Sequence, residues 1–232
     1  MSEASEKVAG IRHMPLFPLQ TVLLPNELLP LHIFEPRYRQ MLKDIGLEKN
    51  FFGVSYFNSG ETLAEKPPVD TIGCVAEVRE LQNLPDGRSN ILSIGIIRYR
   101  LLEYVDTGDP YFVGEVEFFE DDLEDLTVLE PLADEVFNLF KRVARAAHKL
   151  SGEHGQFPEI PQAAPEMLSF LVTAAFNFED EIKYKLLETR STVARLEKLR
   201  EILRQTVGKM EESADIHKIS QTNGHSKKKI DL

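Results

Sequence analysis

The sequence has very little cysteine and no long apolar run. Among its 232 residues there is one cysteine, Cys74, and no tryptophan. A single cysteine cannot form a disulfide within the chain or supply a multi-cysteine zinc site. No window approaches the roughly 18 uninterrupted apolar residues that a transmembrane helix needs. These absences exclude a disulfide-rich secreted scaffold and a membrane span, and they make the cytoplasm the default expectation for location.

Basic residues are also scarce. Lys and Arg total 27 against 38 Asp and Glu, so the net charge is −11 and the isoelectric point is about 5.1. This balance disfavours nucleic acid, because affinity for phosphates comes largely from basic side chains that release counterions. Arg98 and Arg100 are the only close basic pair in the predicted strands, and the lysines at 227–229 are too few to indicate nucleic-acid binding. The acidic, polar start of the chain predicts neither a signal peptide nor a transit peptide.

Motifs of common catalytic sites are absent. The sequence contains no G-x-S-x-G elbow, no G-x-x-x-x-G-K-[ST] phosphate loop and no H-E-x-x-H pair. His32 and Glu35 are three residues apart and could form a metal or acid–base pair on one helix face. We favour the alternative that His32 ends a strand and Glu35 caps the next helix, because two ligands do not make a zinc site. We therefore predict no enzymatic activity, no metal and no cofactor.

The first half of the chain is patterned as β structure. Short segments that are rich in β-branched and aromatic residues or alternate in polarity are typical of strands, and they occur at residues 51–57, 71–81, 91–102 and 111–119. Between the second and third of these, Leu84-Pro-Asp-Gly-Arg88 places proline and glycine where a tight turn needs them, which predicts a hairpin. One helix is expected at residues 36–46, opened by a proline and closed by a glycine.

After Glu120 the apolar period changes to that of helices. Apolar residues at helical spacing predict helices at residues 129–147, from 165, at 180–187 and at 191–207. Strands followed by helices indicate an α+β fold. We expect four parts along the chain: a flexible N-terminal arm at 1–13, a β-barrel subdomain at 14–120, a helical subdomain at 121–210 and a disordered tail at 211–232.

Two short segments concentrate polar and aromatic side chains. Residues 35–39 surround a tyrosine with one glutamate and two arginines, and an internal Glu–Arg pair is favoured there over a binding face. Residues 86–88 are expected to serve the turn, with contact to a partner as the alternative. We expect a mainly structural role, with a binding role as the alternative, for the following residues: His32, Phe34, Glu35, Arg37, Tyr38, Arg39, Asp86, Gly87 and Arg88.

The most specific signal lies in residues 15–41. The chain there closely resembles the opening of the Lon protease N-terminal, or substrate-binding, domain in the segments Pro15-Leu-Phe-Pro-Leu-Gln-Thr-Val-Leu-Leu-Pro25 and Leu29-Pro-Leu-His-Ile-Phe-Glu-Pro-Arg-Tyr-Arg-Gln-Met41. Counterparts follow in the same order, namely Phe52-Gly-Val54, Ile72-Gly-Cys74, Leu84-Pro-Asp-Gly-Arg88, Gly95-Ile-Ile-Arg-Tyr-Arg100, Lys185-Leu-Leu-Glu188 and Arg195-Leu-Glu-Lys-Leu199. The resemblance extends over residues 12–206.

The resemblance implies a fold and a role. The fold is a PUA-like β-barrel, at residues 14–120, followed by a C-terminal helical bundle. In full Lon proteases this domain engages protein substrates, and an ATPase module and a Ser–Lys peptidase follow it; this sequence has the motifs of neither. The chain therefore resembles a stand-alone, non-enzymatic module that binds protein or peptide segments, as an adaptor or holdase in protein quality control.

Two other functions stay open at this stage. PUA-like barrels in other families bind RNA, although the net charge of −11 argues against RNA here. An accessory subunit of an ATP-dependent protease is the other alternative. The expected partners are protein or peptide segments, including a separate protease, with no membrane; self-association through the helical part stays open.

Overall fold

The structure is a computed structural model that describes residues 2–46, 50–57, 66–150 and 159–223, with the side chains of 211–223 left aside. It divides into two compact units. The barrel unit comprises Met1–Leu123 and Thr173–Ser191, and the helical unit comprises Glu124–Val172 and Thr192–Leu232. Each unit is described by itself below.

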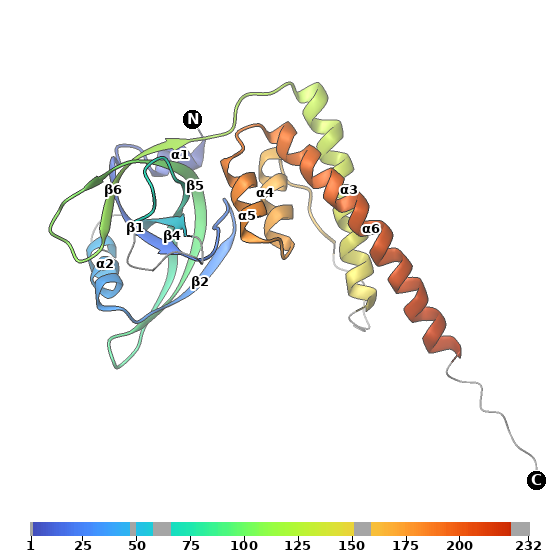
Figure 1. Ribbon diagram of the computed structural model, residues 1–232, viewed down its shortest axis with the longest axis horizontal. Coiled ribbons are helices and arrows are strands. Elements are labelled where there is room, and N and C mark those ends of the chain that lie inside the picture. The colour runs from blue at the N-terminus through green and yellow to red at the C-terminus, as the bar shows by residue number, and fades with distance from the viewer. Residues whose placement is uncertain (1, 47–49, 58–65, 151–158, 224–232) are drawn as a thin grey trace, which may run out of the picture. The chain divides into compact units, whose positions relative to one another are not determined.

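The barrel unit contains six strands and most of the short helices (Figure 1). Its elements are α1 (Glu3–Lys7), β1 (His13–Leu19), β2 (Leu28–Ile33), α2 (Pro36–Gly46), β3 (Phe51–Tyr56), β4 (Ile72–Asn83), β5 (Ser89–Val105), β6 (Phe112–Phe119) and α5 (Asp180–Glu188). The strand order is β2-β5-β4-β3-β1-β6, and β6 also pairs with β5. Five strands therefore close into a barrel, and β2 is attached outside the ring along one edge of β5.

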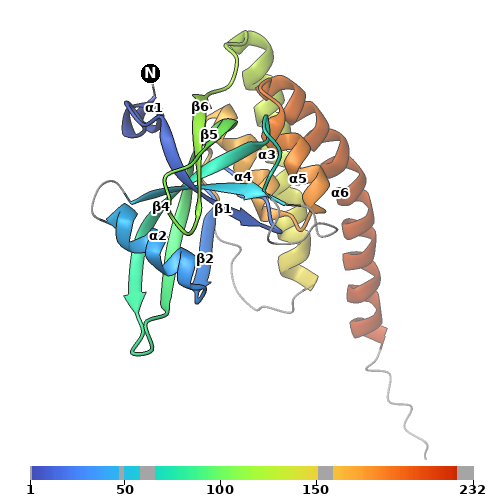
Figure 2. The ribbon, with the colours of Figure 1, turned by 60° about the vertical axis from the view of Figure 1, so that its left-hand side comes forward.

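Strand β5 makes this arrangement possible because it is long enough to change neighbours. Its first residues, up to Ile94, pair with β2, whereas those from Arg98 onward pair with β6. Along its other edge it pairs with β4 over most of its length. Among the strands that the structure describes, β1 and β3 pair in parallel and the other pairs are antiparallel. The β4–β5 hairpin thus protrudes from the closed barrel together with β2, and α2 lies beside them in both views (Figures 1 and 2).

The barrel interior is packed around Tyr99, which is fully buried. Its hydroxyl lies 2.7 Å from Ser55 Oγ, which satisfies a polar group that would otherwise be costly to bury. Gly73 leaves the space that the ring needs, because a Cβ at that position would overlap both the ring and the carbonyl of Val54. The β strands therefore carry small residues where the aromatic ring crosses them.

Burial raises the phenol pKa of every tyrosine in the chain. The affected residues are Tyr38, Tyr56, Tyr99, Tyr104, Tyr111 and Tyr184. Loss of solvent is the largest cause for each, and it raises the pKa of Tyr38 to about 12. Below pH about 10 neither the folded nor the unfolded chain ionises these groups, so they add no pH dependence there.

We expect the protein to lose stability steeply above pH about 10. The unfolded chain then releases phenol protons that the folded chain retains, so each further rise in pH lowers the free energy of unfolding. Tyrosinate absorbance and far-ultraviolet circular dichroism, titrated together, should change in one common transition; the absence of tryptophan keeps the absorbance signal clean. Tyrosinate formation near pH 10 with an unchanged dichroism spectrum would contradict the burial of these rings.

The helical unit consists of α3 (Leu126–Leu150), most of α4 (Pro165–Ala175) and α6 (Thr192–Asn223). Helices α3 and α6 pack along each other (Figure 1). Leu196, Leu199 and Leu203 of α6 are each 0% exposed, as their spacing of three and four residues predicts for one helix face. The predicted α+β fold, a β-barrel followed by helices, is confirmed.

The boundaries of the parts differ from those expected at 1–13, 14–120, 121–210 and 211–232. Residues 173–191 belong to the barrel unit, because Ile72 N donates to the hydroxyl of Tyr184 at 3.1 Å and the rings of Tyr56 and Tyr184 lie 5.4 Å apart. In place of a loose arm, α1 forms near the start, where Ser5 Oγ donates to Glu120 at 2.8 Å and Val8 is buried in the barrel core.

The backbone of α6 continues to Asn223, and residues 224–232 of the tail predicted at 211–232 lie outside the described residues.

Candidate functional site

The two segments highlighted by the sequence meet at the protruding end of the barrel unit. The β2–β5 register places His32 opposite Asn90 and Ile33 opposite Ser89, directly after the β4–β5 turn. The turn is closed by a hydrogen bond of 2.8 Å that Leu84 N donates to the Arg88 carbonyl, and Gly87 has a φ of +79°. That backbone conformation favours glycine, so the sequence Leu84-Pro-Asp-Gly-Arg88 folds as the predicted hairpin turn.

A chain of polar contacts links the turn to β2. Arg88 Nη1 lies 3.3 Å from Nε2 of His32, and Nδ1 of the same ring lies 2.7 Å from Asn90 Oδ1. These partners fit the tautomer with its proton on Nδ1, because arginine can only donate. Arg88 also pairs with Asp86 at 2.5 Å, and this hydrogen-bonded guanidinium lowers the pKa of the Asp86 carboxyl. His32 thus lies at the end of β2, one position before the last residue of the strand.

The start of α2 carries a second ion pair. Glu35 precedes the helix and its carbonyl accepts from the backbone N–H groups of Tyr38 and Arg39. Its carboxylate lies 2.9 Å from Arg37, whose guanidinium also stands 4.5 Å over the ring of Tyr38. Glu35 therefore contributes to the helix start and to an internal Glu–Arg pair, the arrangement favoured from the sequence.

Arg39 lies against the turn. A Cβ at Gly87 would overlap its Nη2 and come within 3.0 Å of its Cζ, so the guanidinium occupies the space that a side chain would fill. Glycine at position 87 thus serves both the turn and the packing of this arginine.

The solvent-facing side of the β2–β5 pair is apolar along most of its length. Alternation along each strand puts one set of side chains on this side, and we call it the β2–β5 face: Leu28, Pro30, His32, Asn90, Leu92 and Ile94. Phe34 follows β2 and lies near His32, with ring centroids 6.2 Å apart. Leu28 and Phe34 are each 60% exposed, so both apolar side chains present most of their surface to solvent.

Strand β2 is the first strand of the sheet order and has one strand neighbour, β5. Pro30 removes one backbone donor from it, a feature common on edge strands. The sequence indicated the polar residues of this region but not the exposed apolar face, because that face depends on the pairing of β2 with β5.

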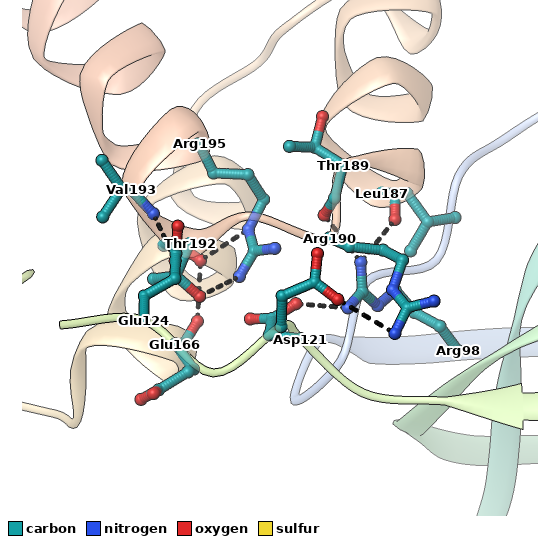
Figure 3. A network of polar contacts seen from close by, with 12 residues as sticks. Arg98, Asp121, Glu124, Glu166, Leu187, Thr189, Arg190, Thr192, Val193 and Arg195 are labelled. Carbon is teal, nitrogen blue, oxygen red and sulfur yellow. Dashed lines mark hydrogen bonds and ion pairs between the residues drawn. The ribbon is translucent and has the colours of Figure 1, made fainter.

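A second polar network, centred on Arg98 and drawn in Figure 3, stabilises the fold of the barrel unit and lies outside the candidate site. Arg98 is paired with Asp121 and donates from Nη1 to the carbonyls of Leu187 at 2.9 Å and Thr189 at 2.8 Å. Its guanidinium also stands 4.6 Å from the ring centroid of Phe119. These contacts hold the chain after α5 against the end of β6. Arg98 is therefore unavailable to a nucleic-acid backbone.

The helical unit has its own buried arginine (Figure 3). Arg195 is 0% exposed, and it donates from Nε to Ser169 Oγ at 3.0 Å and from Nη2 to Thr192 Oγ1 at 3.1 Å. Its guanidinium stands 4.2 Å over the ring of Phe170. These contacts join the start of α6 to α4, and a helical pattern in the sequence gives no sign of them because arginine usually marks an exposed position.

A hollow of about 550 Å³ lies between the start of β1 and the end of α2. The Tyr111 hydroxyl donates to Asp44 Oδ2 at 2.9 Å there, while Arg12 and His13 face solvent. With two of its polar groups bonded to each other, the hollow offers no convergent set for a ligand. We therefore place the candidate site on the β2–β5 face.

Within the ranges that the structure describes, no group of three or more His, Cys, Asp and Glu side chains could hold a metal ion. Burial strongly raises the pKa of the Cys74 thiol, which is consistent with an unreactive core position. None of the described helices is long and apolar enough to span a membrane.

Comparisons with known proteins agree on one family. The family model described as the ATP-dependent protease La (LON) substrate-binding domain matches residues 13–205. Curated relatives include the Lon proteases of Desulforamulus reducens, 26% identical over 193 residues, and Anaeromyxobacter dehalogenans, 29% identical over 205 residues. Each alignment covers 82% of this chain but 23% of the relative, so the chain spans about a quarter of their length.

Two solved structures share the fold. A Lon N-terminal domain protein from Xanthomonas campestris matches with a TM-score of 0.59 and 23% identity, over 82% of this chain and 97% of that one. The N-terminal domain of Lon protease from the Mycobacterium avium complex matches with a TM-score of 0.61 and 15% identity, over 83% and 98%. By the match over residues 13–205, this chain belongs to the family of Lon substrate-binding domains.

Proposed function

We propose that this protein is a non-enzymatic module that binds protein or peptide segments, and that it uses the β2–β5 face and Phe34 to do so. The observation that carries the proposal is the exposure of two large apolar side chains. Leu28 lies opposite Ile94, next to the Pro30–Leu92 pair, and Phe34 lies near His32 at the other end of β2. Apolar side chains gathered on one side of a strand pair are typical of interaction sites. The description of the family as a substrate-binding domain supports the same role.

The cellular role that fits such a module is that of an adaptor or holdase in protein quality control, working in the cytoplasm beside a separate protease. Service as an accessory subunit of an ATP-dependent protease is a closely related form of the same role. ATP hydrolysis and peptide-bond cleavage form no part of the proposed function.

RNA binding is the weaker candidate. Of the close basic pair that the sequence indicated, Arg98 is buried with Asp121, and the exposed Arg100 has a carboxylate, Asp70, at 3.8 Å. A low-salt gel-shift titration with structured RNA should therefore show no salt-sensitive complex.

Replacing Phe34 with serine should weaken the binding of unfolded protein about tenfold, because an aromatic side chain that becomes buried in an interface often contributes about 1–2 kcal/mol. Fluorescein-labelled β-casein, which has little stable structure of its own, is a suitable probe in an anisotropy titration.

The matched control for Phe34→Ser is Val69→Ser. Val69 is 50% exposed and apolar, but it lies away from the β2–β5 face, in the segment before β4. Its replacement should leave the affinity unchanged. Equal losses in both variants, or no binding by the unmodified protein, would overturn the proposed function.

A further inference from the structure

Two acidic side chains beside the β2–β5 face pair with arginines. Glu35 pairs with Arg37 at 2.9 Å, and Asp86 pairs with Arg88 at 2.5 Å. Each of these two carboxylates is thus compensated by a neighbouring guanidinium.

Arg39 is the exception. Among the described residues, no carboxylate pairs with its guanidinium, although the side chain is half-buried against Gly87. A partly desolvated guanidinium without an anion is an unfavourable arrangement that an incoming carboxylate would relieve.

The guanidinium of Arg39 packs against the β4–β5 turn. A Cβ at Gly87 would overlap Nη2 of Arg39, and the turn that carries Gly87 is closed by backbone hydrogen bonds. A planar guanidinium is preorganised for a carboxylate, so it loses less side-chain entropy for each hydrogen bond formed than an ammonium group does.

Arg39 is also connected to the apolar face. It lies on Gly87; the next residue, Arg88, contacts His32, and the His32 ring lies beside Phe34. One bound segment could therefore place an apolar side chain near Phe34 and a carboxylate near Arg39.

We infer that the module selects segments in which an acidic side chain neighbours an apolar one, and that the guanidinium of Arg39 binds the carboxylate of the acidic side chain. This selectivity rests on the proposed peptide-binding function and adds the class of segment to it. Glu80 lies on the same side of the sheet, two strands from Pro30 through Leu92, and its carboxylate repels acidic groups from that part of the face. The acidic residue is thus directed toward the α2 end.

The test uses three fluorescein-labelled peptides with blocked C-termini and a common apolar Phe-Leu centre, flanked by glutamate, glutamine or lysine. Anisotropy titrations at low salt should give the glutamate peptide about fivefold to tenfold higher affinity than the lysine peptide, a range typical of a partly desolvated charge-assisted contact. In Arg39→Gln this preference should fall to about twofold or less, while the glutamine peptide should bind with unchanged affinity. Arg39→Lys keeps the positive charge but loses the two parallel N–H donors of the guanidinium, so it should retain part of the preference.

Arg204→Gln is the matched control, because it removes the same charge from an exposed position in α6. It should leave the preference intact. Thermal melts of each variant check that the fold is retained. If all three peptides bind unmodified protein equally, the acidic selectivity is wrong and the proposed function stands. A preference that survives Arg39→Gln also overturns the inference, and failure of every peptide to bind overturns the proposed function as well.

Discussion

Replacing Asp121 with alanine should lower the free energy of unfolding by about 3–5 kcal/mol, because the change leaves a buried guanidinium without its carboxylate. The side chain of Arg98 is 3% exposed and that of Asp121 is 9% exposed, so water cannot take the place of the lost partner. The carbonyls of Leu187 and Thr189 still accept hydrogen bonds from Arg98 but carry no compensating charge. A fall in melting temperature of about 10 °C is expected for a chain of this size.

Asp122 supplies the control for this prediction. It pairs with Arg190 at 3.0 Å, but both side chains are more than half exposed. Asp122→Ala should therefore cost no more than about 1 kcal/mol. The double variant Arg98→Met with Asp121→Ala should recover part of the stability lost by Asp121→Ala, since it removes the unpaired charge. Urea titrations followed by circular dichroism measure all three; equal losses in Asp121→Ala and Asp122→Ala would contradict the buried pair.

The sequence was informative where structure is determined locally. Alternating and helical periodicities correctly indicated a β half followed by helices, and Leu84-Pro-Asp-Gly-Arg88 correctly predicted a hairpin turn. Resemblance to the Lon substrate-binding domain, carried by residues 15–41, then identified the family, and the family model over 13–205 confirms it. Each of these signals depends on neighbouring residues or on a contiguous motif.

Long-range contacts could not be predicted from the sequence. The return of 173–191 to the barrel unit depends on contacts such as that between Tyr184 and Ile72, which are 112 positions apart. The burial of Arg98 and Arg195 depends on carbonyl and hydroxyl acceptors from other elements, so both arginines have the sequence signature of exposed residues. Pairing of polar groups across the fold cannot be inferred from spacing along the chain.

The candidate site was partly foreseen. Glu35, Arg37 and the residues of the turn were predicted as a mainly structural set with binding as the alternative, and the structure brings them together at one end of the barrel unit. The contact of Arg39 with Gly87 and the exposed β2–β5 face follow only from the strand pairing. A binding role for these residues stays a prediction, tested by the Phe34 and Arg39 variants.

The helical unit should be even more sensitive to a charge in its interior. Leu199 is 0% exposed on the face of α6 that packs along α3, so Leu199→Asp should cost about 4–6 kcal/mol through lost apolar burial and the desolvation of a carboxylate. Lys198→Asp is the matched control: it introduces the same residue one position earlier, where the side chain is 55% exposed and its i,i+3 partner is Glu201. This variant should lose no more than about 1 kcal/mol.

The pH dependence of Leu199→Asp separates a buried charge from a simple cavity. Burial raises the pKa of the introduced carboxyl in the folded state above its unfolded value of about 4, so the folded variant binds the extra proton as the pH falls. The stability deficit relative to the unmodified protein should therefore be largest at neutral pH and shrink as the pH approaches 4. Leu199→Asn creates a similar cavity and a similar polar group without a charge, so its deficit should stay constant over the same range. Urea titrations at several pH values measure both. Parallel pH profiles for the two variants would mean that position 199 is open to water, and the packing of α6 on α3 through Leu199 would then be wrong.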